Sequence, residues 1–190
     1  MSVTAVVMLV VLFFIAVYGV SIYNALVRVK HGVTKAWSNI DVLLKQRHDE
    51  LPKLVETCKQ YMQHERTTLE QVIAARNAVG SARERGDVSA VGQAESGLRA
   101  GLGQLFALAE NYPQLKANES FQFLQQRISG LENGIADRRE LYNEAVNINN
   151  VRIEQFPDVI VARAFSFKPA DLLVFSEAEK ADVDVKALFG

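Results

Sequence analysis

Cysteine, histidine and proline are scarce in this chain of 190 residues, and each shortage excludes a class of structure. The single cysteine, Cys58, excludes an intrachain disulfide framework. The histidines His31, His48 and His64 lie sixteen or seventeen positions apart, whereas a metal-binding pair on one helix face needs a spacing of three or four. With four prolines and almost no alternating β-branched runs, the chain is predicted to be all-α.

Charge of either sign is missing from residues 2–27, and most of this stretch is apolar. A membrane-spanning helix needs roughly 20 mainly apolar residues, so Val3 to Ile22 is long enough to cross a bilayer. Tyr18 and Tyr23 lie near its far end, where amphipathic rings favour the headgroup region. The helical pattern continues past the first charge, Arg28, which predicts a span that runs directly into a soluble helix.

A cleaved signal peptide is the alternative to an anchor, and the flanking residues argue against it. No lysine or arginine precedes the apolar run, which is longer than the usual signal core. Gly19 and Ser21 leave weak cleavage as an alternative, whereas the lack of a cysteine at 19–23 excludes a lipoprotein anchor there. We therefore expect an uncleaved anchor.

The distribution of basic residues predicts the orientation of this anchor. Several follow the span closely and none precedes it: Arg28, Lys30, Lys35, Lys45 and Arg47. The positive-inside bias places the N-terminus outside and the remaining chain in the cytoplasm. The net charge of −1 indicates neither a nucleic-acid partner nor a general attraction to anionic lipid.

An apolar seam predicts one long helix after the span. Its members advance in alternating steps of four and three, as in a heptad repeat: Val33, Trp37, Ile40, Leu44, Arg47, Leu51, Leu54, Cys58, Tyr61 and Glu65. Arg47 and Glu65 interrupt the seam, and each is expected either to face inward with a partner or to lie at a solvated edge. Pro52 is expected to kink the helix near residues 48–51 without stopping it, and the helix is predicted to end near Gly80.

Two further seams predict the next long helices. Asp87 is a candidate N-cap for a helix that runs to about Tyr112. Asn118 or Ser120 is the candidate N-cap of a further helix that ends before Pro157. The first seam comprises Val91, Ala94, Leu98, Leu102, Leu105, Ala109 and Tyr112. The second comprises Phe121, Leu124, Ile128, Leu131, Ile135, Arg138, Tyr142, Ala145 and Asn149, and its polar members Arg138 and Asn149 are candidates to pair with Glu65 or with backbone carbonyls.

The remaining chain predicts a short helix and an extended tail. Residues 157–165 (PDVIVARAF) are expected to form an apolar helix that closes the bundle as its fourth member. The tail carries apolar clusters at Leu172–Phe175 and Val185–Phe189. We expect these clusters to pack on the bundle, with docking of a partner as the alternative.

The chain resembles the LemA family from Tyr23 to about Phe175. The resemblance is carried by YNALV at 23–27, AWSNIDVLLKQRHDELPKLVETCKQYMQHE at 36–65, AARNA at 74–78, ENYPQLKANESFQFLQ at 110–125 and RRELYNEAVNINNVRIEQFPDVIVARAFSF at 138–167. It implies an antiparallel four-helix bundle on an N-terminal bacterial membrane segment, and no chemistry. We thus predict an anchor at 1–22, a bundle at 23–166 and an extended or partly ordered tail at 167–190.

No arrangement of residues typical of catalysis stands out. Cys58 lies on an apolar seam with no histidine three or four residues away, which favours an inert buried thiol. His64 and Glu65 lack the Glu-x-x-His pattern of metal-binding bundles, and residues 80–86 are predicted to be a solvated turn. Tyr112, Tyr142, Asn143 and Asn149 are predicted to make polar contacts that specify the bundle. We therefore predict no catalytic, cofactor-binding or metal-binding residues and no enzymatic activity.

The sequence leaves two candidate functions. The first is a non-enzymatic inner-membrane scaffold that assembles as a homo-oligomer and organises or shapes the bilayer. One face of the span, Val6, Leu9, Phe13, Ala16 and Val20, is a candidate contact between copies, with lipid exposure as the alternative. The second function is an adaptor or regulator that binds a membrane protease or another envelope protein.

Overall fold

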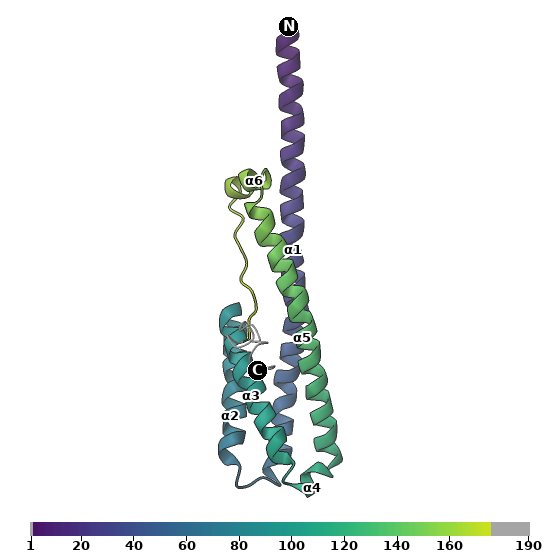
Figure 1. The fold of residues 1–190 in the computed structure, drawn as a ribbon, viewed down its shortest axis with the longest axis vertical. Helices are drawn as coiled ribbons and strands as arrows, with labels where there is room; N and C mark the ends of the chain where they lie inside the picture. Colours follow the sequence, from purple (N-terminus) through teal and green to yellow (C-terminus); the bar gives the residue numbers. More distant parts are fainter. Residues whose placement is uncertain (1, 176–190) are drawn as a thin grey trace, which may run out of the picture. The chain divides into compact units, whose positions relative to one another are not determined.

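The structure is a computed structural model that describes residues 2–175, and over that range the chain is helical without a strand (Figure 1). Its helices are α1 (Val3–Lys59), α2 (Arg66–Glu84), α3 (Val88–Ala109), α4 (Pro113–Lys116), α5 (Glu119–Glu154) and α6 (Asp158–Ala164). The chain divides into two compact units. Over the described residues, the N-terminal unit comprises 2–39 with Glu140–Asp171, and the bundle unit comprises Ile40–Arg139 with 172–175.

The apolar run predicted to be a span forms the start of α1. Among the described residues, α1 is the one helix that is long and apolar enough to cross a membrane. Large apolar side chains are exposed along this part of α1, for example Phe13 at 64% and Phe14 at 65%. Water disfavours such a surface, so the exposure fits a lipid environment. The helix continues without a break through residues 23–32, where a flexible linker would have separated the anchor from the soluble part of the helix.

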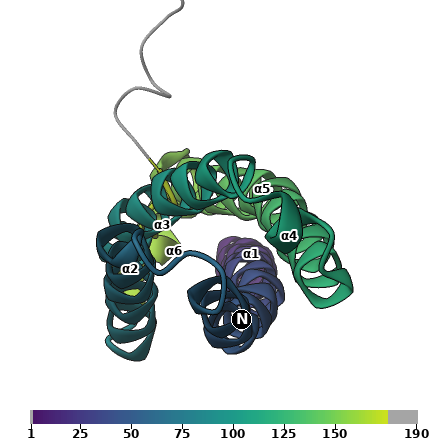
Figure 2. The same cartoon turned by 90° about the horizontal axis from the view of Figure 1, so that it is seen from below.

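In the bundle unit, the second part of α1 packs against α2, α3 and the first half of α5. Figure 2 shows these three helices arranged around α1. The seam predicted for this part of α1 is confirmed, because its members from residue 40 to residue 58 are buried: Ile40, Leu44, Arg47, Leu51, Leu54 and Cys58. The predicted N-caps Asp87 and Asn118 are also confirmed. Asp87 accepts from the Ala90 amide at 2.9 Å, and Asn118 accepts from the Phe121 amide at 3.0 Å.

The prediction that the first helix ends near Gly80 was wrong. α1 ends at Lys59, and α2 begins at Arg66 as a separate helix. The turn between them contains no glycine or proline and is held instead by tertiary contacts. Met62 is fully buried, and the Tyr61 hydroxyl accepts a hydrogen bond from the Asn118 side chain at 3.1 Å. Local propensity carries no sign of such a turn, because its stability comes from packing.

The fourth helix of the bundle is α2, so the assignment of residues 157–165 to that position was also wrong. α6 forms within this stretch but belongs to the N-terminal unit. There Ala162 of α6 shares an apolar cluster with Ile22 and Leu26 of α1 and Ile153 of α5. The overall class, an all-α fold with an apolar N-terminal helix leading into an antiparallel bundle, is as predicted.

The predicted seam of α5 is correct at every position except two. Tyr142 and Asn149 are buried as predicted, but Arg138 is exposed, and Val146 is fully buried in place of the expected Ala145. A helix has 3.6 residues per turn, so a buried stripe drifts away from a strict heptad over a long helix. The tail is extended from Phe167 to Phe175, where Leu173 and Phe175 are buried in the bundle unit as expected. The predicted cluster at Val185–Phe189 lies outside the described residues.

Candidate functional site

A concave surface of the N-terminal unit lies just beyond the predicted span. It is a cleft of about 720 Å³ between α1, the end of α5 and the chain that follows α6, and we call it the Lys30 cleft. α1 contributes Tyr23, Val27, Lys30, His31 and Thr34, whose spacing places them along one helix face. The opposite wall comprises residues 165–170, with Asn149 from α5.

The wall at 165–170 is shaped by the way α6 ends. Ser166 has a φ of 55°, a left-handed conformation that reverses the chain after the last helical turn. The Ser166 amide donates to the Arg163 carbonyl at 3.2 Å, and the Phe167 amide donates to the Ala162 carbonyl at 2.9 Å. This pair of bonds is a Schellman motif, and it directs the chain back along α5.

Two asparagines of α5 then fix the returning chain. Asn150 donates to the Ala170 carbonyl and accepts from the Ala170 amide, both at 2.9 Å. The Asn150 side-chain amide therefore makes the same pair of hydrogen bonds with the Ala170 backbone that a residue of a neighbouring β-strand would make. Asn149 is buried and donates to the Lys168 carbonyl at 3.5 Å. Of the two partners considered for Asn149, Glu65 or a backbone carbonyl, the structure shows the carbonyl.

Aromatic and basic groups line the same cleft. Tyr23 packs against Phe165 and Phe167, with ring centroids 4.8 and 5.8 Å apart. Lys30, His31 and Lys168 supply the titratable nitrogens, and no aspartate or glutamate is among its lining residues in the described chain. The combination suits a ligand with an apolar part and an anionic part.

Exposed apolar side chains also mark the N-terminal unit outside the span. On α5, Leu141, Ile148 and Val151 are 61%, 49% and 52% exposed, and their spacing of seven and three places them on one face. Around α6, Phe156 is 81% exposed and Ile160 is 61% exposed. Grouped apolar surface of this kind is typical of contacts with another protein or with a membrane.

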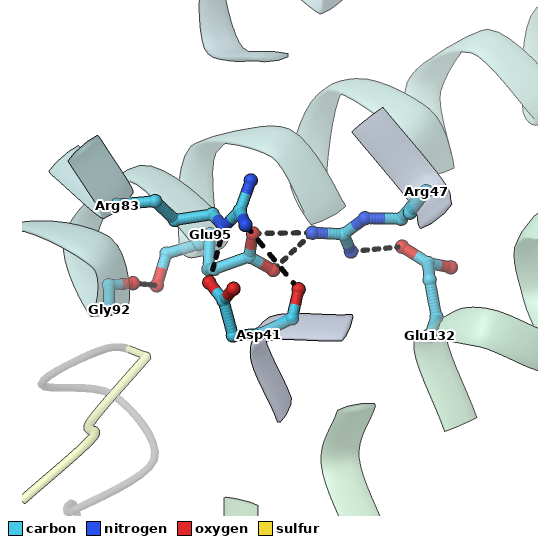
Figure 3. Close-up of polar contacts among 7 residues, drawn as sticks. Asp41, Arg47, Arg83, Gly92, Glu95 and Glu132 are labelled. Atoms are coloured by element: carbon cyan, nitrogen blue, oxygen red, sulfur yellow. Dashed lines mark hydrogen bonds and ion pairs between the residues drawn. The ribbon is translucent and has the colours of Figure 1, made fainter. Parts of the chain in front are cut away.

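A buried ion cluster lies in the bundle unit. Arg47 of α1 donates through Nη2 to both carboxylate oxygens of Glu95 on α3, and its Nη1 lies 3.8 Å from Glu132 Oε1 on α5 (Figure 3). Arg47 and Glu95 are almost completely buried. Burial raises the pKa of Glu132, and the Arg47 guanidinium opposes that rise. Arg47 therefore faces inward with a partner, which was one of the two alternatives predicted for it.

Glu95 was not predicted from the sequence, although its position carries a signal. It lies four residues after Val91 and three before Leu98, both of which are buried members of the α3 seam. A carboxylate on such a stripe is a candidate partner for a cation on a facing stripe. Arg83 and Asp41, also in Figure 3, form a second ion pair at 2.8 Å that is only partly buried.

The other predicted polar positions are dispersed between the two units. Glu65 is half-buried and accepts a hydrogen bond from the Tyr112 hydroxyl at 3.2 Å. Its partner is therefore not Arg138 or Asn149, for which it was one of the candidates. Tyr142 donates to the Asp171 carbonyl at 2.9 Å, and burial raises its pKa to about 12. Asn143 is half-buried.

The remaining candidates for chemistry are separate from one another. Cys58 is fully buried in the apolar core of the bundle unit, whereas His64 is exposed. Within residues 2–175, no group of three or more His, Cys, Asp or Glu side chains is placed to hold a metal ion.

Comparison with known proteins gives one family and several relatives. The profile of the LemA family matches residues 36–187. Magnetosome proteins MamQ 1 and MamQ 2 of Paramagnetospirillum magneticum are each 26% identical over 186 residues, covering 86% of this chain and 68% of theirs. Magnetosome protein MamQ of Magnetospirillum gryphiswaldense is 24% identical with the same coverage.

Proposed function

Because the chain belongs to the LemA family, we propose that it is a non-enzymatic, single-pass scaffold of a bacterial inner membrane that self-assembles and organises or shapes the bilayer. The observation that carries this proposal is α1, whose exposed apolar start continues as one unbroken helix into folded units. An unbroken helix couples the orientation of the anchor to the soluble part, which a flexible tether does not. The relatives named as magnetosome proteins support a role at a membrane.

Self-assembly is supported by the apolar stripe of α5, defined by Leu141, Ile148 and Val151. These side chains are 49–61% exposed and lie outside the predicted span, where water surrounds them in a single copy. Pairing the stripe with the same stripe of a second copy removes this area from water at about 25 cal/mol per Å². Inside the bilayer, lipid gives no comparable drive, so the face from Val6 to Val20 is a secondary contact.

The proposed orientation places the N-terminus outside and both units in the cytoplasm. Arg28, Lys30 and Lys35 follow the span and are exposed, which supports the positive-inside assignment. Lys45 is also exposed, but Arg47 is buried in the ion cluster and is unavailable to lipid. Single-cysteine labelling from each side of the membrane, in a Cys58→Ala background with Ser2→Cys or Ser38→Cys, tests this orientation.

The assembly is tested by measuring the size of the full-length protein in mild detergent by light scattering. We expect assemblies of more than one copy, and Leu141→Ser/Ile148→Ser should shift them to a smaller species. Phe123→Ser is the matched control, because Phe123 is an equally exposed apolar residue of α5 that lies in the bundle unit, outside the stripe.

A monodisperse monomer for the unmodified protein would contradict the scaffold and favour the alternative, an adaptor that binds a membrane protease or another envelope protein. The first apolar cluster of the tail gives that alternative little support, since Leu173 and Phe175 are buried. A monomer that carries a stoichiometric protein partner from the native membrane would establish the adaptor.

A further inference from the structure

We propose that the Lys30 cleft is a binding site for the headgroup phosphate of an anionic phospholipid from the membrane that α1 enters, with Lys30 and Lys168 as its cationic ligands. This inference rests on the proposed membrane anchoring and not on self-assembly. It assigns a local function to a surface that the small net charge of the chain does not reveal.

The cleft lies within side-chain reach of lipid headgroups. If the span ends at Ile22, Tyr23 lies at the boundary, and Lys30 lies about 12 Å beyond Ile22 along the helix at 1.5 Å per residue. The headgroup layer occupies roughly 5–8 Å on each side of the hydrocarbon core. Side chains on a helix lean toward its N-terminus, which here is the membrane side, so the Lys30 ammonium can reach that layer.

The chemistry of the cleft fits a phosphate and an acyl chain together. Lys30 and Lys168 approach from α1 and from the returning chain, and no acidic side chain of the described residues lines the space between them. The rings of Tyr23, Phe165 and Phe167 supply an apolar wall. A volume of about 720 Å³ lies within the range of small-molecule sites and suits a glycerophosphate headgroup.

The position of α6 favours a lipid over a soluble anion. Its residue Ala162 packs on Ile22 and Leu26, which places the helix at the end of the span. Phe156, Ile160 and Phe165 are 81%, 61% and 62% exposed there, as expected of side chains that enter the acyl boundary. A soluble phosphate would give these side chains nothing to contact.

Native mass spectrometry of the full-length protein, with phosphatidylglycerol or phosphatidylcholine added to the detergent, tests the proposal. We expect retention of phosphatidylglycerol and at least a tenfold weaker apparent affinity in Lys30→Gln/Lys168→Gln. Arg28→Gln/Lys35→Gln is the matched control, because it removes the same number of charges from α1 residues on either side of Lys30 that do not line the cleft. This control should bind phosphatidylglycerol within about twofold of the unmodified protein.

Three outcomes overturn the proposal. Equal losses in the two variants indicate general electrostatic attraction to the surface and no site. Retention of phosphatidylcholine equal to that of phosphatidylglycerol shows that the anionic charge of the lipid does not determine binding. Competition by free glycerol phosphate as strong as that by the lipid indicates a soluble-anion site. The size measurement separates this inference from the scaffold, since a monomer that still retains phosphatidylglycerol contradicts only self-assembly.

Discussion

The Arg47 guanidinium donates to both carboxylate oxygens of Glu95, and the two side chains are almost completely buried between α1 and α3. Removing Glu95 leaves only Glu132, 3.8 Å away, to offset the buried Arg47 charge within the described residues. We therefore expect Glu95→Ala to lower the free energy of unfolding by about 3–5 kcal/mol. Urea unfolding of the full-length protein in mild detergent, followed by circular dichroism, measures the change.

Two variants show whether charge is the cause of that loss. Arg47→Met/Glu95→Leu should recover most of it, because an apolar pair of similar size avoids the desolvation of both ions. Glu56→Ala breaks an exposed pair with Lys59 and should change the free energy by no more than about 0.5 kcal/mol. If the double variant is as unstable as Glu95→Ala, packing and not charge explains the loss.

Pro52 and Arg76 form a second relationship that stability measurements can test. A helix normally bonds the amide of residue 52 to the carbonyl of residue 48, and proline has no amide hydrogen. Arg76 Nε of α2 donates to the His48 carbonyl at 2.8 Å and so satisfies the group that Pro52 leaves without its helical partner. Arg76→Ala should cost about 1 kcal/mol, because it leaves a partly buried acceptor without its partner.

A double-mutant cycle isolates this coupling. Pro52→Ala returns the amide to the helix, so Arg76→Ala should cost clearly less in that background. Strictly additive effects would show that the Arg76 side chain stabilises α2 in some other way.

The close approach of Gly92 to the tail predicts opposite effects for two glycines of α3. A Cβ at Gly92 would collide with the Val174 carbonyl oxygen, whereas nothing lies within 4 Å of a Cβ placed at Gly97. Gly92→Ala should therefore destabilise the protein and release Phe175 from its contact with Arg139, 4.3 Å from the ring centroid. Gly97→Ala should stabilise it by about 0.5–1 kcal/mol, because alanine favours a helix interior.

Hydrogen exchange of the amides at 172–175 gives the local measurement for this pair. Exchange there should accelerate in Gly92→Ala and stay unchanged in Gly97→Ala. Equal stabilities for the two variants would contradict the role of Gly92 in seating the tail.

Periodicity predicted the helices and most of their buried faces because burial repeats along a helix. It failed where the decisive contacts are distant in sequence. The turn at Met62 depends on Asn118, and the Lys30 cleft depends on a chain reversal at Ser166 and on pairing of Asn150 with Ala170. Arg47 was recognisable as an anomaly on its seam, but only the fold shows that Glu95 faces it.

The single cysteine reports on opening of the bundle unit. Cys58 is fully buried, and burial raises the pKa of its thiol to about 12. The reactive thiolate is therefore scarce near neutral pH, and the sulfur is also out of reach of reagents. We expect maleimide labelling, measured by mass spectrometry, to be slow in native buffer and complete in urea. A variant with Ser38→Cys, at an exposed position of α1, should label rapidly at that site in both conditions. Rapid native labelling of Cys58 would show that the core opens without global unfolding.

His48 makes stability depend on pH in a direction fixed by its surroundings. Burial, and then the nearby Arg76 charge, lower the pKa of His48 below 6.5. Between the lowered pKa of His48 in the folded state and its ordinary value of 6.5 in the unfolded state, the unfolded chain binds more protons than the folded one. The free energy of unfolding should therefore fall as the pH drops below about 6.5 and level off below the folded pKa. Glu132, whose pKa is raised by burial, acts in the opposite direction, so the contribution of His48 must be taken from a difference between variants.

Urea titrations across this pH range should show a weaker pH dependence of the free energy of unfolding in His48→Gln than in the unmodified protein. His64→Gln, at an exposed position, should retain the pH dependence. An unchanged slope in His48→Gln would assign the pH dependence to other groups.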